Sequence, residues 1–177
     1  MARPGIVEPA MVLVSMIHRS DEALKRAAAE LEEIFGSPEL RSEPYRFDMS
    51  PYYEDEMGTG LQRLWLAFGR LVDPARLPDW KLSCHRLEER LSTDGKRTVN
   101  LDPGYMDLGK LVLASFKPAP EKIYMGDGVW AHTCLLYGHG RFTAPEHSFP
   151  DFADGRFDGF LTEVRRVYRR LLAEEKG

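Results

Sequence analysis

Carboxylates that could bind a metal ion concentrate after residue 47 and in one motif farther along the chain: Asp48, Glu54, Asp55, Glu56 and Asp102. Paired carboxylates with open coordination positions suit Mg²⁺ or Mn²⁺, which prefer hard oxygen ligands. Such an ion could in turn bind a phosphate, so Glu54, Glu56 and Asp102 form a candidate metal site. The alternative, which we favour, is a solvated acidic loop and an aspartate that only shapes a turn, because spacing alone does not show convergence.

The segment Asn100–Tyr105 has the composition of a turn, and it contains more polar residues than a turn requires. Asp102 can accept a hydrogen bond from the backbone two residues on, Pro103 fixes φ, and Gly104 permits positive φ. The flanking amide and phenol are not required by a turn, and they offer a donor, acceptors and a ring to a ligand. Structural and binding roles both stay open here. The candidate ligand-binding residues are Tyr53, Asn100, Asp102, Tyr105 and Lys110.

No familiar catalytic motif is present in the sequence. It lacks GxxxxGK[ST], GxGxxG leading from a strand into a helix, HExxH and GxSxG. No two of its histidines have the i, i+4 spacing of a helical metal site. The catalytic residues, if the protein is an enzyme, are therefore unknown from the sequence.

These residues must be positioned by an α+β fold. The order of elements predicts a ferredoxin-like βαββαβ unit extended by further β-strands and a C-terminal helix, all in a single domain over residues 1–177. Apolar runs, caps and glycine turns predict the boundaries. The expected strands cover 11–17, 43–49, 61–71, 97–101, 108–116, 123–125, 129–136 and 141–143, and the expected helices cover 20–35, 78–92 and 156–173.

Composition limits the class of protein. The chain has 177 residues, 43% of them hydrophobic, which is enough for a substantial core. Its net charge of −4 gives no overall electrostatic attraction to nucleic acid or to anionic lipid. The run 11–17 is too short to span a bilayer. Cys84 and Cys134 have no zinc-site spacing, and we expect them to be reduced and mostly buried in a cytoplasmic protein of unknown oligomeric state.

Several segments together resemble a known family. They are Pro51–Gly58 (PYYEDEMG), Val99–Tyr105 (VNLDPGY), Lys110–Ser115 (KLVLAS), Ile123–Val129 (IYMGDGV) and Phe149–Phe152 (FPDF). In this order they resemble the bacterial family known as domain of unknown function 4416, over nearly the whole chain. The resemblance implies no particular activity.

Two functions remain as expectations. The first is binding of a phosphorylated or nucleotide-like ligand, with or without a reaction, in the polar loops Tyr53–Gly58 and Asn100–Tyr105. The second is a non-catalytic RNA- or protein-interaction module that uses aromatic loops and the arginines at 165–170. A clustered acidic pocket would favour the first function, and a continuous basic and aromatic surface would favour the second.

Overall fold

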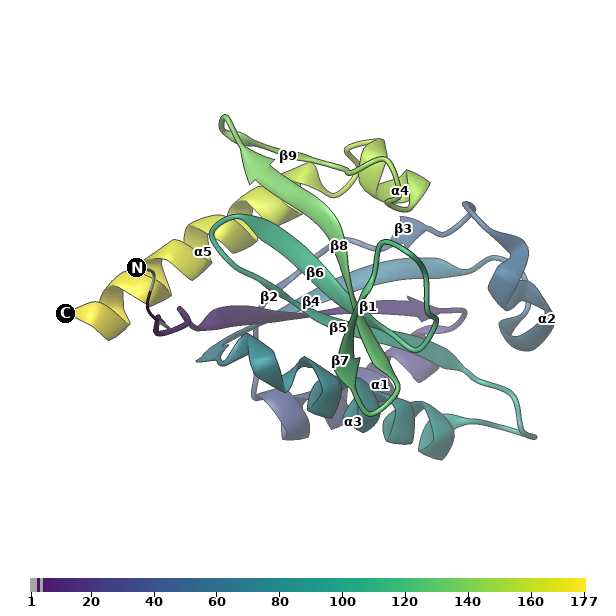
Figure 1. Cartoon of the computed structure of the whole chain (residues 1–177). Coiled ribbons are helices and arrows are strands. Elements are labelled where there is room, and N and C mark those ends of the chain that lie inside the picture. The colour runs from purple at the N-terminus through teal and green to yellow at the C-terminus, as the bar shows by residue number, and fades with distance from the viewer. Residues whose placement is uncertain (1–2, 4) are drawn as a thin grey trace.

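The structure is a computed structural model that describes Arg3 and residues 5–177. Its centre is a nine-stranded antiparallel sheet with the strand order β2-β4-β1-β5-β6-β8-β7, in which β3 pairs with β4 and β9 with β8 (Figure 1). The strands are β1 (Ala10–His18), β2 (Pro38–Arg41), β3 (Tyr45–Arg46), β4 (Gln62–Val72), β5 (Val99–Met106), β6 (Lys110–Ser115), β7 (Ile123–Gly126), β8 (Val129–Gly138) and β9 (Arg141–Thr143). The helices are α1 (Asp21–Phe35), α2 (Glu54–Met57), α3 (Leu77–Leu91), α4 (Pro150–Ala153) and α5 (Asp158–Lys176).

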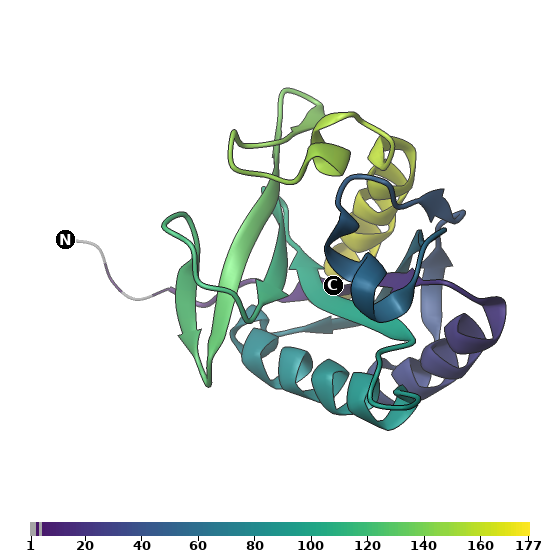
Figure 2. The same cartoon turned by 90° about the vertical axis from the view of Figure 1, so that its right-hand side faces the viewer.

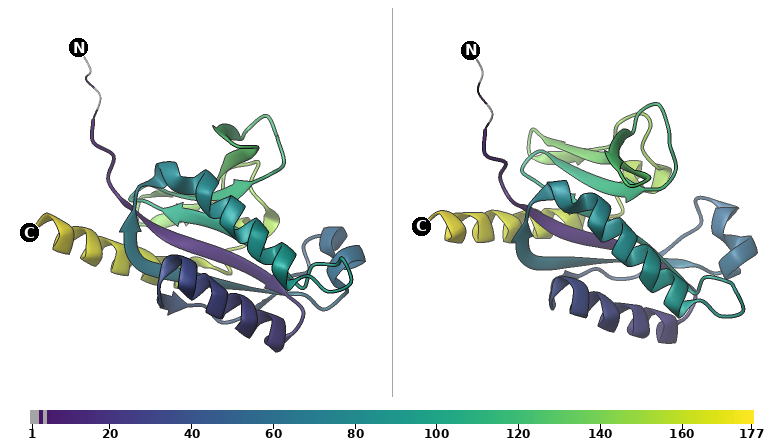
Figure 3. Two further views of the ribbon diagram at one scale, coloured as in Figure 1. Left: turned by 90° about the horizontal axis from the view of Figure 1, so that it is seen from below. Right: turned by 60° about the horizontal axis from the view of Figure 1, so that its bottom comes forward.

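Helices cover both faces of the sheet around β1. All nine residues of β1 are buried, because α1 and α3 lie side by side on one face and α5 lies across the other (Figures 1 and 3). Val12, Val14 and Met16 belong to the core beneath α1 and α3, whereas Met11 and Leu13 belong to the core beneath α5. A strand covered on both faces needs a continuous apolar sequence. The apolar run 11–17 has this pattern, and it predicted β1.

Local signals explain several boundaries. Ser20 caps α1, since its Oγ accepts a hydrogen bond from the backbone N of Ala23 at 3.2 Å, and Gly36 ends the helix at a φ of 87°. The glycines around Asp127 turn the β7–β8 hairpin, and those around His139 turn the β8–β9 hairpin. The predictions for these elements, for β4, α3 and β6, and for the C-terminal helix are confirmed.

Four short elements were missed or predicted with the wrong length. Strand β2 begins at Pro38, where no strand was expected, and the strand expected over 43–49 is reduced to the two residues of β3. The short helices α2 and α4 lie in segments where no helix was expected. Short edge strands and single helical turns carry too few residues for hydrophobic periodicity to detect.

The largest correction concerns Asp102–Pro103–Gly104, which lies within β5 and does not form a turn. Ser15 of β1 is opposite Asp102, and Leu13 is opposite Gly104. The ladder with β6 covers only Gly104–Met106, so the first half of β5 has a free edge on its β6 side, where a strand tolerates proline. Gly104 has no positive φ. It is needed because an added Cβ would overlap the carbonyl oxygen of Val112.

Both thiols are free and buried, as expected. They lie in different cores, Cys84 beneath α3 and Cys134 on the α5 side of the sheet. Burial raises the pKa of both thiols. We therefore expect a water-soluble thiol reagent to label the native protein at least about tenfold more slowly than the same protein in denaturant. Rapid labelling of either cysteine in native buffer would contradict this placement.

Candidate functional site

A pocket of about 440 Å³ opens where β5 and β6 separate. Asn100 and Asp102 come from the unpaired edge of β5, and Ala114 and Ser115 come from the end of β6. Figure 2 looks at this end of the molecule, with the α2 segment at the centre, α4 above it and the β6–β7 connection to the left. The remaining lining residues are Phe47, Met49, Ser50, Tyr52, Tyr53, Arg63, Lys81, Arg97, Leu113, Phe116, Lys117, Lys122, His132, Phe149, Pro150, Asp151 and Phe152.

A buried ion pair forms the floor of the pocket. Lys81, on the inner face of α3, donates to Asp102 Oδ1 at 2.8 Å and to the carbonyl of Leu101 at 2.9 Å. Its side chain is only 6% exposed and that of Asp102 is 22% exposed. Burial alone would raise the pKa of the Asp102 carboxyl, but Lys81, Arg63 and Asn100 together hold that pKa below its ordinary value. Asp102 therefore stays charged at neutral pH.

Hydrogen bonds continue from this pair to α2. Asn100 Nδ2 donates to Asp102 Oδ2 at 2.7 Å, and Asn100 Oδ1 accepts from Arg97 Nη1 at 2.9 Å. Arg97 also donates through Nε and Nη2 to the two carboxylate oxygens of Glu56, at 2.9 and 2.6 Å. Arg97 lowers the pKa of the Glu56 carboxyl, although burial acts weakly in the opposite direction. The two polar segments expected to converge, 53–58 and 100–105, are thus linked through Arg97.

Another buried pair crosses the pocket on the α4 side. Arg63 of β4 forms an ion pair with Asp151 of α4, and both side chains are at most 8% exposed. The guanidinium carbon lies 4.8 Å from the centre of the Phe47 ring and 5.8 Å from that of Phe152. Arg63 Nε has no hydrogen-bond partner among the described residues. This arrangement fixes α4 against the sheet.

The β6–β7 connection carries two lysines into the pocket. Lys122 Nζ donates to Ser115 Oγ and to the carbonyl of Lys117, each at 3.1 Å. Lys117 Nζ lies 3.2 Å from the centre of the Tyr52 ring, which is a cation–π contact between this connection and the segment before α2. Burial lowers the pKa of Lys122, with the charge of Lys117 adding to the effect. Neither ammonium group forms an ion pair with a carboxylate in the described part of the chain.

His132 of β8 faces the same pocket without a partner. His132 is only 3% exposed, and neither ring nitrogen has a hydrogen-bond partner in the part of the chain that the structure describes. The rings of Phe149 and His147 lie 5.4 and 5.5 Å from its ring centre, and Glu121 Oε1 is 3.9 Å from its Nδ1. Burial lowers the pKa of His132, and Lys122 and His147 lower it further. Buried polar atoms are normally paired, so the two unpaired ring nitrogens of His132 make it a candidate residue of the site.

The structure divides the predicted site residues into two groups. Tyr53, Asn100 and Asp102 line the pocket. Tyr105 instead packs against the core beneath α1 and α3, and Lys110 pairs with Asp107 at the other end of β5 and β6. Burial, with Asp102 adding, raises the pKa of Tyr53, so its hydroxyl remains protonated. The pocket therefore lies at one end of β5, and the predicted pair Tyr105 and Lys110 lies away from it.

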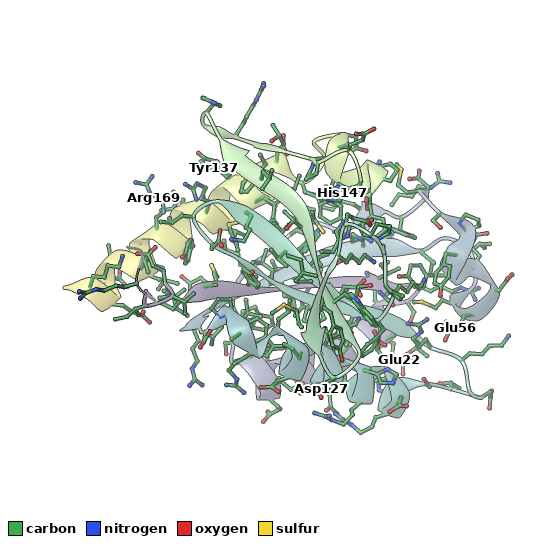
Figure 4. The ribbon with its side chains drawn as sticks, in the orientation of Figure 1. Glu22, Glu56, Asp127, Tyr137, His147 and Arg169 are labelled. Atoms are coloured by element: carbon green, nitrogen blue, oxygen red, sulfur yellow. The ribbon has the colours of Figure 1, made fainter. Side chains whose placement is uncertain are left out.

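Two of the three carboxylates considered for a metal ion have protein partners. Glu56 binds Arg97, and Asp102 binds Lys81, while Glu54 lies exposed on α2 (Figure 4, where Glu56 marks the α2 side of the site and His147 the side near α4). Among residues 3 and 5–177, no three His, Cys, Asp or Glu side chains are grouped to hold a metal ion. Binding of Mg²⁺ or Mn²⁺ by Glu54, Glu56 and Asp102 stays a prediction, and it would need Arg97 and Lys81 to release their carboxylates.

Six basic residues of the pocket were not selected from the sequence: Arg63, Lys81, Arg97, Lys117, Lys122 and His132. Two of them carried a readable signal. Arg63 directly precedes the apolar run 64–68 of β4 at a buried position, and Lys81 falls on the buried face of α3 next to Trp80 and Cys84. A charged residue at such a position needs a buried partner, which marks it as a site candidate. Lys122 and His132 had no such signal, because only the fold brings them together.

Comparison of the sequence with models of known protein families assigns the chain to a family. A family model described as Domain of unknown function (DUF4416) matches residues 8–168. The chain belongs to this family. The DUF4416 match contains every residue that lines the pocket and ends within α5. Searches of curated proteins and of solved structures gave no match. Of the helices that the structure describes, none combines the length and apolar character needed to cross a membrane.

Proposed function

We propose that the pocket at the β5–β6 separation binds a phosphorylated or nucleotide-like small molecule. The observation that carries the proposal is the charge of the pocket lining, which is basic and not acidic as the sequence led us to expect. The lining contains the five cationic side chains Arg63, Lys81, Arg97, Lys117 and Lys122 against two carboxylates, Asp102 and Asp151, in a chain whose net charge is −4. Cations gathered in a concave site raise the local concentration of an anion. Lysine and arginine are also the usual binders of phosphate groups.

Aromatic rings give the pocket a second recognition surface. Six line it: Phe47, Tyr52, Tyr53, Phe116, Phe149 and Phe152. Stacking of a base on an aromatic side chain contributes about 1–3 kcal/mol. Small-molecule sites combine mostly apolar walls with a few placed polar groups, and the volume of about 440 Å³ is within their usual range. An anionic ligand with a flat ring therefore suits this lining better than a simple inorganic anion does.

The alternative of an RNA- or protein-interaction module has less support. The basic residues of α5 are largely occupied, since Arg166 pairs with Glu163, and Arg170 pairs with Glu39 and Glu174. Arg165 donates to the carbonyl of Leu108 and lies 3.6 Å from the centre of the Tyr137 ring. A helix whose cations are neutralised in this way is a poor phosphate-backbone binder. The lysines of the pocket are the better candidates for binding phosphate.

The proposed scaffold for the site is a ferredoxin-like unit. The strand order β2-β4-β1-β5, with α1 and α3 as connections on one face, supports this assignment. In this description, β6 to β9 extend the sheet beyond β5, and the pocket lies at the junction between the unit and its extension.

Removing the two lysines of the β6–β7 connection should weaken binding. In Lys117→Gln/Lys122→Gln we expect nucleotide dissociation constants to rise by at least about a hundredfold, because hydrogen bonds to charged groups contribute about 1.5–3 kcal/mol each and two are lost. The measurement is isothermal titration calorimetry with AMP, GMP, CMP and UMP. The control is Lys25→Gln/Lys96→Gln, which removes the same charge from exposed positions outside the pocket.

Two outcomes would contradict the proposal. One is that no nucleotide, sugar phosphate or inorganic phosphate binds the wild-type protein at millimolar concentration. The other is that the pocket variant and the control variant bind equally well, which would mean that general surface charge attracts the ligand. Unfolding of the pocket variant is not expected, because both lysines lie on a connection outside the helices and strands.

A further inference from the structure

The charges of the pocket are not equally available to a ligand. Lys81 is paired with Asp102, Arg63 with Asp151, and Arg97 with Glu56. Lys117 and Lys122 have no carboxylate partner in the described part of the chain, and both are on the β6–β7 connection. The atoms that they contact directly, Ser115 Oγ, the carbonyl of Lys117 and the Tyr52 ring, are uncharged, and Glu121, whose charge raises the pKa of Lys122 against the effect of burial, forms no ion pair with either lysine. The free charge of the pocket is therefore that of two ammonium groups on one wall.

His132 belongs to the same wall. Its strand partner Leu113 and the lysine-bound Ser115 are both on β6, two residues apart. The two ring nitrogens are buried and lack a partner in the described structure, although the site is polar. A phosphate oxygen placed between Lys122 and His132 would accept a hydrogen bond from the imidazole N–H. It would also neutralise the charge of Lys122. Glu121, which lies 3.9 Å from His132 Nδ1, does not line the pocket.

We infer that the ligand is a phosphomonoester with one flat ring, such as a nucleoside monophosphate, whose phosphate is bound by Lys117, Lys122 and His132. This inference rests on the proposed function and narrows it. A phosphomonoester carries about −1.5 to −2 charges at pH 7, which matches two unpaired lysines. Each further phosphate would place a negative charge beside groups that are already paired, and an unmatched charge in a partly buried site is costly.

The aromatic side chains place the rest of the ligand. Phe149 lies beside His132, with ring centres 5.4 Å apart, and Phe116 lies next in sequence to Ser115. The Phe116 ring is also 5.3 Å from Lys81 Nζ, so it reaches towards the floor of the pocket. A base attached to a phosphate on the lysine wall would therefore meet aromatic rings within one nucleoside length. A phosphate without a ring would leave these surfaces unused.

The test compares five probes on the wild-type protein by calorimetry in magnesium-free buffer with EDTA: AMP, ADP, ATP, adenosine and ribose 5-phosphate. We expect AMP to bind at least about tenfold more tightly than each of the others. Tighter binding of ATP or ADP than of AMP would overturn the inference and leave the proposed function standing. Equal binding of ribose 5-phosphate and AMP would overturn the role of the ring. Binding of none of the five would remove both the inference and the nucleotide part of the proposal.

A variant of His132 tests the phosphate contact separately. His132→Gln should weaken AMP at least about tenfold and change adenosine by less than twofold. The matched control is His139→Gln, in the β8–β9 turn outside the pocket. Equal weakening of both probes would show that His132 does not contact the phosphate. Because the His132 ring makes no hydrogen bond within the described structure, its replacement should preserve the fold, and the comparison of probes on the wild-type protein does not depend on any variant.

Discussion

Asp102→Asn should lower the free energy of unfolding by about 3 kcal/mol. Removal of one partner from a buried ion pair costs about 3–5 kcal/mol, because the other charge is left without compensation. The lower figure applies because an amide oxygen can still accept a hydrogen bond from Lys81 Nζ, at a site where the side chain of Asp102 is 22% exposed. For a chain of this length the loss corresponds to a melting temperature lower by about 6–12 °C.

Two comparisons separate the buried pair from charge in general. Glu30→Gln removes one carboxylate from the exposed pair with Arg90 and should cost at most about 1 kcal/mol. Lys81→Met/Asp102→Asn removes both charges and should recover at least half of the stability lost in Asp102→Asn, because no unpaired charge remains. The measurement is urea unfolding followed by tryptophan fluorescence. A double variant as unstable as the sum of its single variants would show that the two side chains do not act as a pair.

The same pair predicts the response to acid. The pKa of Asp102 is held below its ordinary value in the folded protein, so its contribution to stability is fully present above about pH 4 and is lost as the pH falls further. Glu56, whose pKa is lowered by Arg97, acts in the same direction. The pKa of Lys81 is raised by Asp102 and Glu88 against the effect of burial, so its contribution is lost only above its ordinary value of about 10.4. Lys81→Met/Asp102→Asn should therefore lose less stability than the wild type between pH 5 and pH 3.

The layers of this fold could be read from the sequence because they depend on long apolar patterns. β1 needs apolar residues on both faces, and α1 has a serine cap and a glycine end. Each pattern spans enough residues to be distinguished from a chance arrangement of apolar and polar residues. The short β2, β3, α2 and α4 could not be predicted, because a two- to four-residue element is stabilised by its neighbours in space and not by its own sequence.

The site was predictable only in part, for a related reason. Asn100 was selected because a turn does not require its side chain, Asp102 because its carboxylate could bind an ion, and Tyr53 because its loop concentrates tyrosine and carboxylate. All three line the pocket. The assignment of Asp102 to a turn was wrong, since Asp102 lies in a strand and its charge is held by Lys81. The sequence Asp-Pro-Gly is compatible with a turn and also with the edge of a strand that closely approaches the neighbouring strand. Only the register with β1 and β6 distinguishes the two.

Gly104→Ala provides a direct test of that close approach. An alanine Cβ at this position would overlap the carbonyl oxygen of Val112 and lie 2.6 Å from Leu113 Cδ2. Overpacking costs about 1–3 kcal/mol, occasionally more. We expect the upper part of this range, about 3 kcal/mol, because the obstructing atom belongs to the backbone of β6 and cannot turn away as a side chain can. The result would be a melting temperature lower by about 6–12 °C in differential scanning calorimetry.

The effect should extend to the pocket, because Gly104 begins the β5–β6 ladder at the point where the two strands separate. Pushing β6 away from β5 would displace Ser115 and the lysine connection that follows it, so the variant should bind AMP more weakly even at temperatures where it remains folded. The matched control is Gly138→Ala in β8, where φ is not positive and no atom lies within 4 Å of the added Cβ. That substitution should change the free energy of unfolding by no more than about 0.5 kcal/mol. If the two alanine variants are equally stable, then β5 and β6 are not in close contact at Gly104, and this glycine is retained for some reason other than the approach of Val112.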